Sequence, residues 1–335
     1  MGRLNTSEER EHTLLTAEEY VRHETSIPRV SDARKLRSAF ERELKHYFAL
    51  AALSRSKSSP RKLVESAHAV VFKFRIVLER RLAVALKRSH LDDAVSLLEM
   101  GCFYGFSKKQ GTSVRMPLTT CKPTRLCAGA CYAHDVLDAA PASVIRGVIN
   151  GLVAEQFEDG TSLIREAVML ALRGHTKRAV QSALTEVRAL RGTGWTRRAF
   201  IRFSHVGEIT KYVRFANELA RQVHEKSQGQ VDCVVYTRHS SARLLNPKLW
   251  VVNFTLDPAS SERREWVPKT ARIVFSAFGG VTSDEADVNF LEHHRHIHMA
   301  RTAGNGRICP ATLPETKERT CDACRCDRCF VAPSL

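Results

Sequence analysis

The sequence predicts an α/β protein built on a parallel sheet. Short runs rich in β-branched and aromatic residues alternate with longer runs of helical periodicity, and strands joined by helical crossovers lie parallel. A loop with three cysteines separates the first of these strands from the helix-like run that follows it. Eight complete strand–helix units are not found, so a partial (β/α) barrel or an open doubly wound sheet fits best.

The first hundred residues precede the sheet and divide into two regions. Residues 1–30 are polar with little periodicity, which predicts a flexible arm. Residues 31–100 predict a basic helical region, with 15 Lys and Arg against 5 Asp and Glu between positions 30 and 90. Helices are expected at 33–53, 61–88 and 91–100.

The basic helical region predicts a nucleic-acid partner, either DNA or RNA. The formal net charge of the whole chain is +16, which favours a polyanionic ligand. One face of the helix expected at 61–88 carries the cations that would contact phosphates, namely Lys73, Arg80, Arg81, Lys87 and Arg88. The same charges would also suit a solvated helical layer packed on the sheet domain, and both interpretations stay open.

Residues 101–305 predict the barrel-like α/β domain itself. Its strands are expected at 114–119, 199–204, 232–237, 249–255 and 272–278, which predicts a sheet of five or six strands. Its main helices are expected at 140–158, 161–190 and 210–226.

No apolar run approaches the roughly 20 residues of a membrane span, and the N-terminus lacks the apolar core of a signal peptide. A cytoplasmic protein without a membrane partner is therefore expected. Disulfides are disfavoured in that compartment, which makes clustered cysteines more typical of metal or cluster ligands.

Three cysteines, Cys121, Cys127 and Cys131, lie in the loop after the strand expected at 114–119, with the spacing C-x5-C-x3-C. The chemistry of α/β folds gathers at the carboxyl ends of strands, so this loop is the first candidate site. Three thiolates can hold a [4Fe–4S] cluster and leave one iron open. Zinc is the competing metal, although structural zinc loops usually supply closer cysteine pairs.

The tail, residues 306–335, contains a second cysteine group and predicts a metal- or cluster-binding segment. The expected ligands are Cys309, Cys321, Cys324 and Cys329, with Cys326 as a spare. Zinc and a second iron–sulfur cluster both suit this pattern, and one of these thiols could instead complete the first cluster. The sequence therefore predicts one or two clusters.

Four further residues follow or end the expected strands, on the rim that the cysteine loop would share: Ser204, Glu208, Tyr236 and Arg238. They could bind a ligand or donate hydrogen bonds to cluster sulfurs. They would serve equally well as ordinary polar residues of strand-to-helix loops.

Five short motifs within and just beyond the α/β domain carry a family resemblance. They are Pro-Leu-Thr-Thr-Cys at 117–121, Cys-Tyr-Ala at 131–133, Ile-Arg-Phe-Ser-x-x-Gly-Glu at 201–208, Tyr-Thr-Arg at 236–238 and Ile-Cys-Pro-Ala at 308–311. In this order they resemble the phage gene product eighty-eight family of phages and other mobile elements. The cysteine loop of that family is similar to that of radical-SAM-like proteins. The resemblance implies a TIM-barrel-like fold that holds an iron–sulfur centre.

The function expected first is that of an iron–sulfur protein of a phage or other mobile element that binds nucleic acid. Radical-SAM enzymes use the spacing C-x3-C-x2-C, whereas this loop reads C-x5-C-x3-C, and no glycine-rich S-adenosylmethionine motif follows the second strand. A radical-SAM-like enzyme using Cys121, Cys127 and Cys131 is one alternative. A non-catalytic interaction protein with structural zinc is the other.

Overall fold

The computed structural model describes residues 103–107, 111–117, 120–122, 124, 126–127, 141–191, 197–204, 206–278, 281–291 and 308–309. The expected arm, the basic helical region and most of the cysteine-rich tail lie outside these residues.

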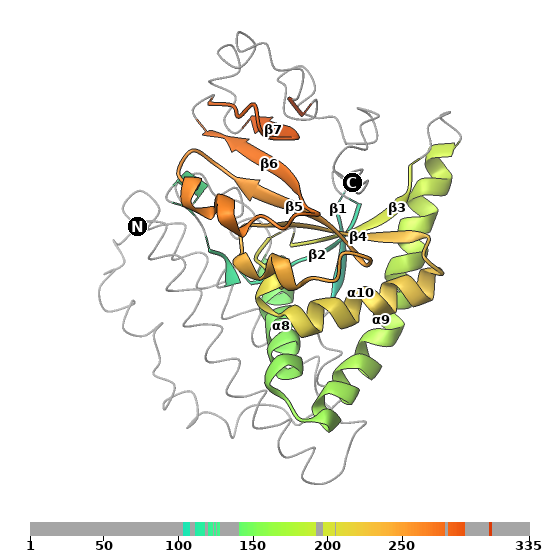
Figure 1. The fold of residues 1–335 in the computed structure, drawn as a ribbon. Helices are drawn as coiled ribbons and strands as arrows, with labels where there is room; N and C mark the ends of the chain where they lie inside the picture. The colour runs from blue at the N-terminus through green and yellow to red at the C-terminus, as the bar shows by residue number, and fades with distance from the viewer. Residues whose placement is uncertain are drawn as a thin grey trace, which may run out of the picture.

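Seven strands form one sheet, in which they lie side by side in their sequence order (Figure 1). The strands are β1 (Tyr104–Ser107), β2 (Gly111–Val114), β3 (Ala199–Phe203), β4 (Val231–Thr237), β5 (Trp250–Leu256), β6 (Arg272–Ala277) and β7 (Val288–Leu291). β1 pairs antiparallel with β2, and every other neighbouring pair is parallel. The carboxyl ends of β2 to β7 therefore share one edge of the sheet.

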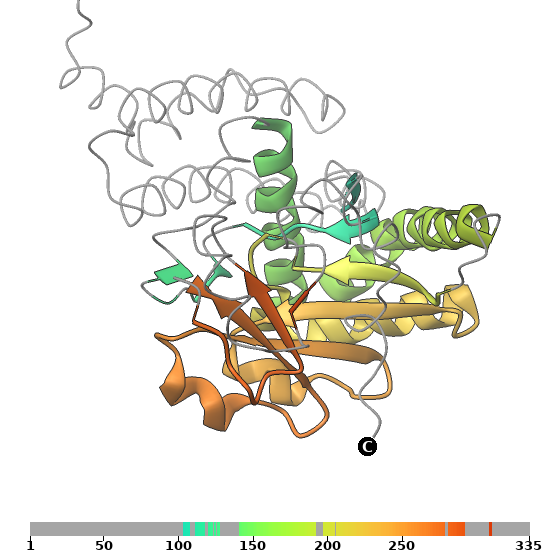
Figure 2. The same ribbon diagram turned by 90° about the horizontal axis from the view of Figure 1, so that it is seen from above.

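Three long helices pack on one face of this sheet: α8 (Pro141–Asp159), α9 (Ser162–Arg191) and α10 (Val213–Ser227). In Figures 1 and 2, α9 and α10 lie together on one side of the strands. An open doubly wound sheet reverses its strand order at a switch point and carries helices on both faces. The described sheet shows neither feature, so it is an α/β sheet of sequential, mostly parallel strands.

Side chains along each strand alternate between the two faces, as the period of two requires. In β3, Ile201 and Phe203 join the large core that the helices cover. Phe200, the residue before Ile201, points to the opposite face, where it packs with Val234 and Val251. The main hydrophobic core thus lies between the sheet and the three helices.

The expected helices and strands between residues 140 and 278 agree with the structure to within a residue at each end, except for α10. This helix begins at Val213 because a 3₁₀ turn, η4 (Ile209–Lys211), precedes it. None of the helices in the described ranges is long and apolar enough to cross a membrane.

Three strands differ from expectation. The strand expected at 114–119 is β2, which ends at Val114; beyond it, the Met116 N–H donates to the Val206 carbonyl of another loop. β1 and β7 were not among the expected strands. Each is only four residues long, and β1 contains a glycine that reads as a break in a strand pattern.

Candidate functional site

The cysteine loop begins at the carboxyl edge of the sheet, where the chain leaves β2. The Met116 N–H donates to the Val206 carbonyl across 2.8 Å, which joins this exit to the loop after β3. Gly207 has φ +73°, and a Cβ there would lie 2.5 Å from the Met116 carbonyl carbon. Only glycine tolerates both that backbone conformation and that approach.

Thr120 fixes the residue directly before Cys121. Its hydroxyl donates to the Pro117 carbonyl at 2.7 Å and accepts from the Glu208 N–H at 2.7 Å. Thr120 is buried, so these bonds form away from solvent. The position of Cys121 is therefore tied to the loop after β3.

A second bond network ties the loop to the ends of β4, β5 and β6. The Thr124 hydroxyl donates to Asp257 Oδ2 at 2.5 Å and accepts from the Cys127 N–H at 3.1 Å. Asp257 directly follows β5, and its side chain is fully buried. Arg238 Nη1 lies 2.7 Å from the same carboxylate oxygen, and Arg238 Nη2 donates to Ser276 Oγ at 3.2 Å. Figure 1 shows the teal segments of this loop beside the arrowhead end of β5.

Glu208 is a buried carboxyl at the centre of this edge. Its Oε1 accepts from Thr210 Oγ1 at 2.6 Å, and its Oε2 accepts from the Arg238 N–H at 3.3 Å. Burial raises the pKa of Glu208, and hydrogen bonds from Thr210, Thr237 and Arg238 oppose that shift only in part. Two of the predicted rim residues, Glu208 and Arg238, are thus brought into contact.

The other two predicted rim residues have different surroundings. Ser204 has φ 57°, an uncommon left-handed conformation for a residue other than glycine, and its Oγ accepts from the Ile209 N–H at 2.9 Å. That bond closes the loop after β3. Tyr236 belongs to the sheet face opposite the helices, where the Arg202 guanidinium lies 4.2 Å from its ring centroid and Phe290 packs beside it.

Cys121 and Cys127 are half-buried and lie on the loop just described. Cys309 is buried among Phe200, Val234, Val251 and Val288, on the face opposite the helices, and its N–H donates to the Asn289 carbonyl at 2.8 Å. Cys233 is buried in the main core. Within the described ranges no three His, Cys, Asp or Glu side chains gather as a metal site.

Several predicted residues lie outside the part of the chain that the structure describes. They are the ligands Cys131, Cys321, Cys324 and Cys329, the spare Cys326, and the basic residues Lys73, Arg80, Arg81, Lys87 and Arg88. Their roles stay predictions.

Sequence reasoning missed two sets of residues at this edge. Asp257 lies two residues after the strand expected at 249–255, so the rule that selected Glu208 and Arg238 would have selected it too. Thr120 belongs to the motif at 117–121, but neither it nor Thr124 could be given its hydrogen-bonding role from the sequence, because their partners lie 88 and 133 positions away.

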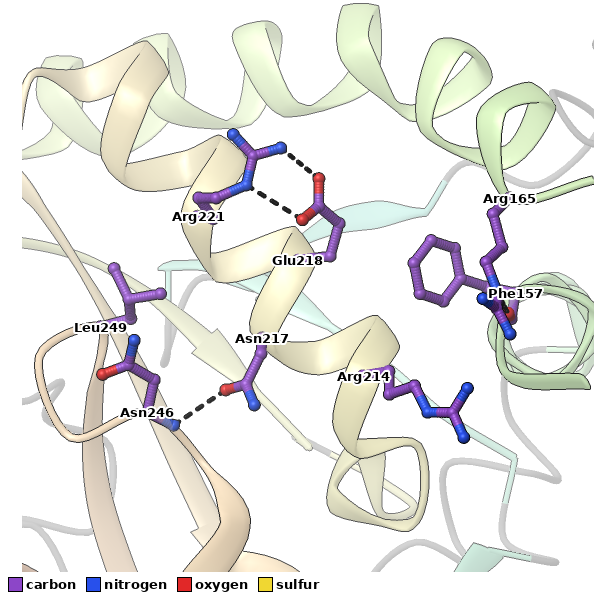
Figure 3. Close-up of a pocket in the computed structure, with 8 residues that line it drawn as sticks. All are labelled: Phe157, Arg165, Arg214, Asn217, Glu218, Arg221, Asn246 and Leu249. Carbon is purple, nitrogen blue, oxygen red and sulfur yellow. Dashed lines mark hydrogen bonds and ion pairs between the residues drawn. The ribbon is translucent and has the colours of Figure 1, made fainter. Parts of the chain in front are cut away.

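An open cavity of about 340 Å³ lies elsewhere, among α8, α9, α10 and the chain before β5 (Figure 3). Arg221 pairs there with Glu218, and Asn217 accepts from the Asn246 N–H at 2.9 Å. Its other lining residues are Phe157, Arg165, Arg214 and Leu249. Of the predicted site residues that the structure describes, none lines this cavity, so the carboxyl edge of the sheet remains the candidate site.

Comparison of the chain with protein-family models, with curated proteins and with solved structures gives no match. The function is therefore inferred from the residues at the sheet edge.

Proposed function

We propose that this chain is an iron–sulfur protein in which Cys121, Cys127 and Cys131 hold a [4Fe–4S] cluster at the edge of a partial (β/α) barrel. One observation carries the proposal: the cysteine loop is held by buried hydrogen bonds to the loops after β3 and β5. A cluster site needs ligands on a fixed backbone, and loops joined to several strand ends supply one.

The strand order supports the barrel part of the proposal. Parallel strands in sequence order, with helices on one face, are the arrangement of a (β/α) barrel wall. In such a barrel the sites lie at the carboxyl ends of the strands, where the loop carrying Cys121 and Cys127 begins.

The charge around the loop suits thiolate ligands. Lys122 follows Cys121 directly, and Arg263 Nη1 donates to the Lys122 carbonyl at 2.7 Å. Nearby cations would offset the negative charge of a bound cluster. When bound, the cluster would supply one-electron chemistry, and with three cysteine ligands it would leave one iron open to another ligand.

At this edge the protein would combine residues that position the ligand loop with a buried carboxyl group that binds a proton. Thr120 and Thr124 hold the ligand loop in position, and the buried Glu208 holds a proton more tightly than an exposed carboxyl does. The hydrogen bonds of the two threonines and the raised pKa of Glu208 do not depend on which metal the loop binds.

Metal and sulfide analysis of the full chain, purified without oxygen, tests the cluster. The proposal expects iron and acid-labile sulfide in equal amounts, with roughly twice as much of both if the tail residues Cys309, Cys321, Cys324 and Cys329 hold a second cluster. Zinc without sulfide would contradict the proposal and support a non-catalytic interaction protein instead.

Radical-SAM-like catalysis is the second candidate function. It is favoured by the position of the cysteine loop, after the first strand of the parallel series, β2. Addition of S-adenosylmethionine to the reduced protein would then change the cluster's paramagnetic resonance spectrum and release 5′-deoxyadenosine. An unchanged spectrum with no such product would leave a cluster protein without that activity.

The proposed partner of the protein is nucleic acid, as expected for a phage or other mobile element. The support is the net charge of +16 and the surplus of Lys and Arg between positions 30 and 90. Reversing the charges of Lys73, Arg80 and Arg81 should weaken binding to DNA or RNA and reduce its salt dependence. Unchanged affinity would show that this region is not the contact.

A further inference from the structure

The edge of the sheet carries a group of cations that extends beyond the cysteine loop. Lys122 belongs to the cysteine loop, Lys211 to η4, and Arg263 to the 3₁₀ turn η6 (Ser261–Trp266). His239 lies two residues after β4, and Ser241, which donates its N–H to His239 Nδ1, also bonds to the Thr210 carbonyl next to Lys211. Four segments that are distant in sequence therefore bring these side chains to one place.

Hydrogen bonds hold these four segments together, and the Glu208 N–H, just before η4, joins that turn to Thr120 of the cysteine loop at 2.7 Å. Arg263 Nη1 donates to the Lys122 carbonyl at 2.7 Å, which joins η6 to the cysteine loop. The Ser241 N–H donates to His239 Nδ1 at 3.2 Å, and the Ser241 hydroxyl bonds to the Thr210 carbonyl within η4. These hydrogen bonds therefore fix the positions of the segments that carry the four side chains.

The carboxylates nearby leave most of this positive charge unbalanced. Asp257 is buried and already paired with Arg238, and Glu208 is buried with a raised pKa. Glu262 lies 3.7 Å from Arg263 Nε, and its side chain is 64% exposed. Among the described residues neither Lys122 nor Lys211 forms an ion pair, and both are exposed to solvent.

The lowered pKa of His239 also indicates an excess of positive charge at this edge. Its pKa is lowered first by burial and then by the charges of Lys122, Lys211 and Arg263. A place where three cations disfavour a fourth positive charge is one where an anion is stabilised. Because Ser241 donates to Nδ1, the neutral imidazole carries its proton on Nε2, which leaves it a hydrogen-bond donor.

We propose that Lys122, Lys211, Arg263 and His239 form a phosphate-binding site that holds the backbone of the bound nucleic acid beside the cysteine loop. The inference rests on the proposed nucleic-acid function and adds a second contact, on the sheet edge, to the basic helical region. Exposed lysines around a partly buried arginine are typical of phosphate contacts that position a strand without reading its sequence.

The experiment measures how salt affects binding of the full chain to fluorescent single-stranded DNA and RNA. The double variant Lys122→Ala/Lys211→Ala removes the two exposed cations of the site. The control Lys177→Ala/Lys226→Ala removes two exposed lysines from α9 and α10, with the same change in net charge. Each lost phosphate contact should reduce the slope of log affinity against log salt by about 0.7.

The expected result is a slope smaller by about 1.4 for the site variant, an affinity lower by on the order of tenfold at 0.1 M salt, and a control that matches the parent chain. If the site variant keeps the parent's slope, the phosphate site is overturned while nucleic-acid binding stands. If the parent chain itself binds neither strand, the nucleic-acid function fails and this site fails with it.

Discussion

The hydroxyl of Thr124 donates a 2.5 Å hydrogen bond to Asp257, joining the cysteine loop to the end of β5. Asp257 also holds the guanidinium of Arg238 at 2.7 Å. One buried carboxylate thus fixes the loop and balances the charge of an arginine that is 14% exposed.

Replacing Asp257 by alanine should destabilise the fold by about 3 kcal/mol, because Arg238 would stay largely buried without its partner. Chemical denaturation measures the change. The matched control is Asp232→Ala, which breaks the pair with Arg198, whose side chain is 57% exposed, and should cost about 1 kcal/mol or less. Equal losses in the two variants would refute a special role for Asp257.

Gly207→Ala should lower the free energy of unfolding by about 2 kcal/mol or more, since the new Cβ would meet the Met116 carbonyl at a positive φ. The control is Gly174→Ala in α9, where a Cβ meets nothing nearer than Arg178 Nη1 at 3.8 Å. That change should be neutral or stabilising by up to about 1 kcal/mol. Thermal or chemical unfolding measures the free energy of unfolding of both variants. Equal values would contradict the close contact between Gly207 and the Met116 carbonyl.

Glu208 should make the stability of the protein depend on pH. Its pKa is raised in the folded state, so its stabilising effect is complete below the pKa of the unfolded chain and is lost as pH rises through the folded value. Glu208→Gln cannot ionise and lacks this dependence. The unfolding free energy of the variant minus that of the parent should therefore increase from about pH 4 upward. A difference that stays constant with pH would mean that the Glu208 carboxyl is not protonated in the fold.

The sequence predicted the long helices and the parallel strands from α8 to β6 well because long apolar helical runs and short runs of β-branched and aromatic residues are visible in the local sequence. β1 and β7 are too short for that signal, and their strand conformation depends on the neighbours they pair with. The two were therefore visible only in the structure.

The site was predictable in part for a similar reason. Glu208 and Arg238 follow strands, and parallel strand ends meet at one edge, so their proximity followed from topology. Tyr236, two positions before Arg238, belongs instead to the sheet face opposite the helices. The group of Lys122, Lys211 and Arg263 depends on how three loops fold over the edge, which no local pattern encodes.

The loop of Cys121, Cys127 and Cys131 is the proposed cluster site. The most direct test compares iron and sulfide in the parent chain, in the variant with all three cysteines changed to alanine, and in the control Cys233→Ala, whose thiol lies in the core. The triple variant should lose the iron and sulfide of one cluster, while the control should keep the full amounts of iron and sulfide. Full iron and sulfide in the triple variant would contradict the proposed site.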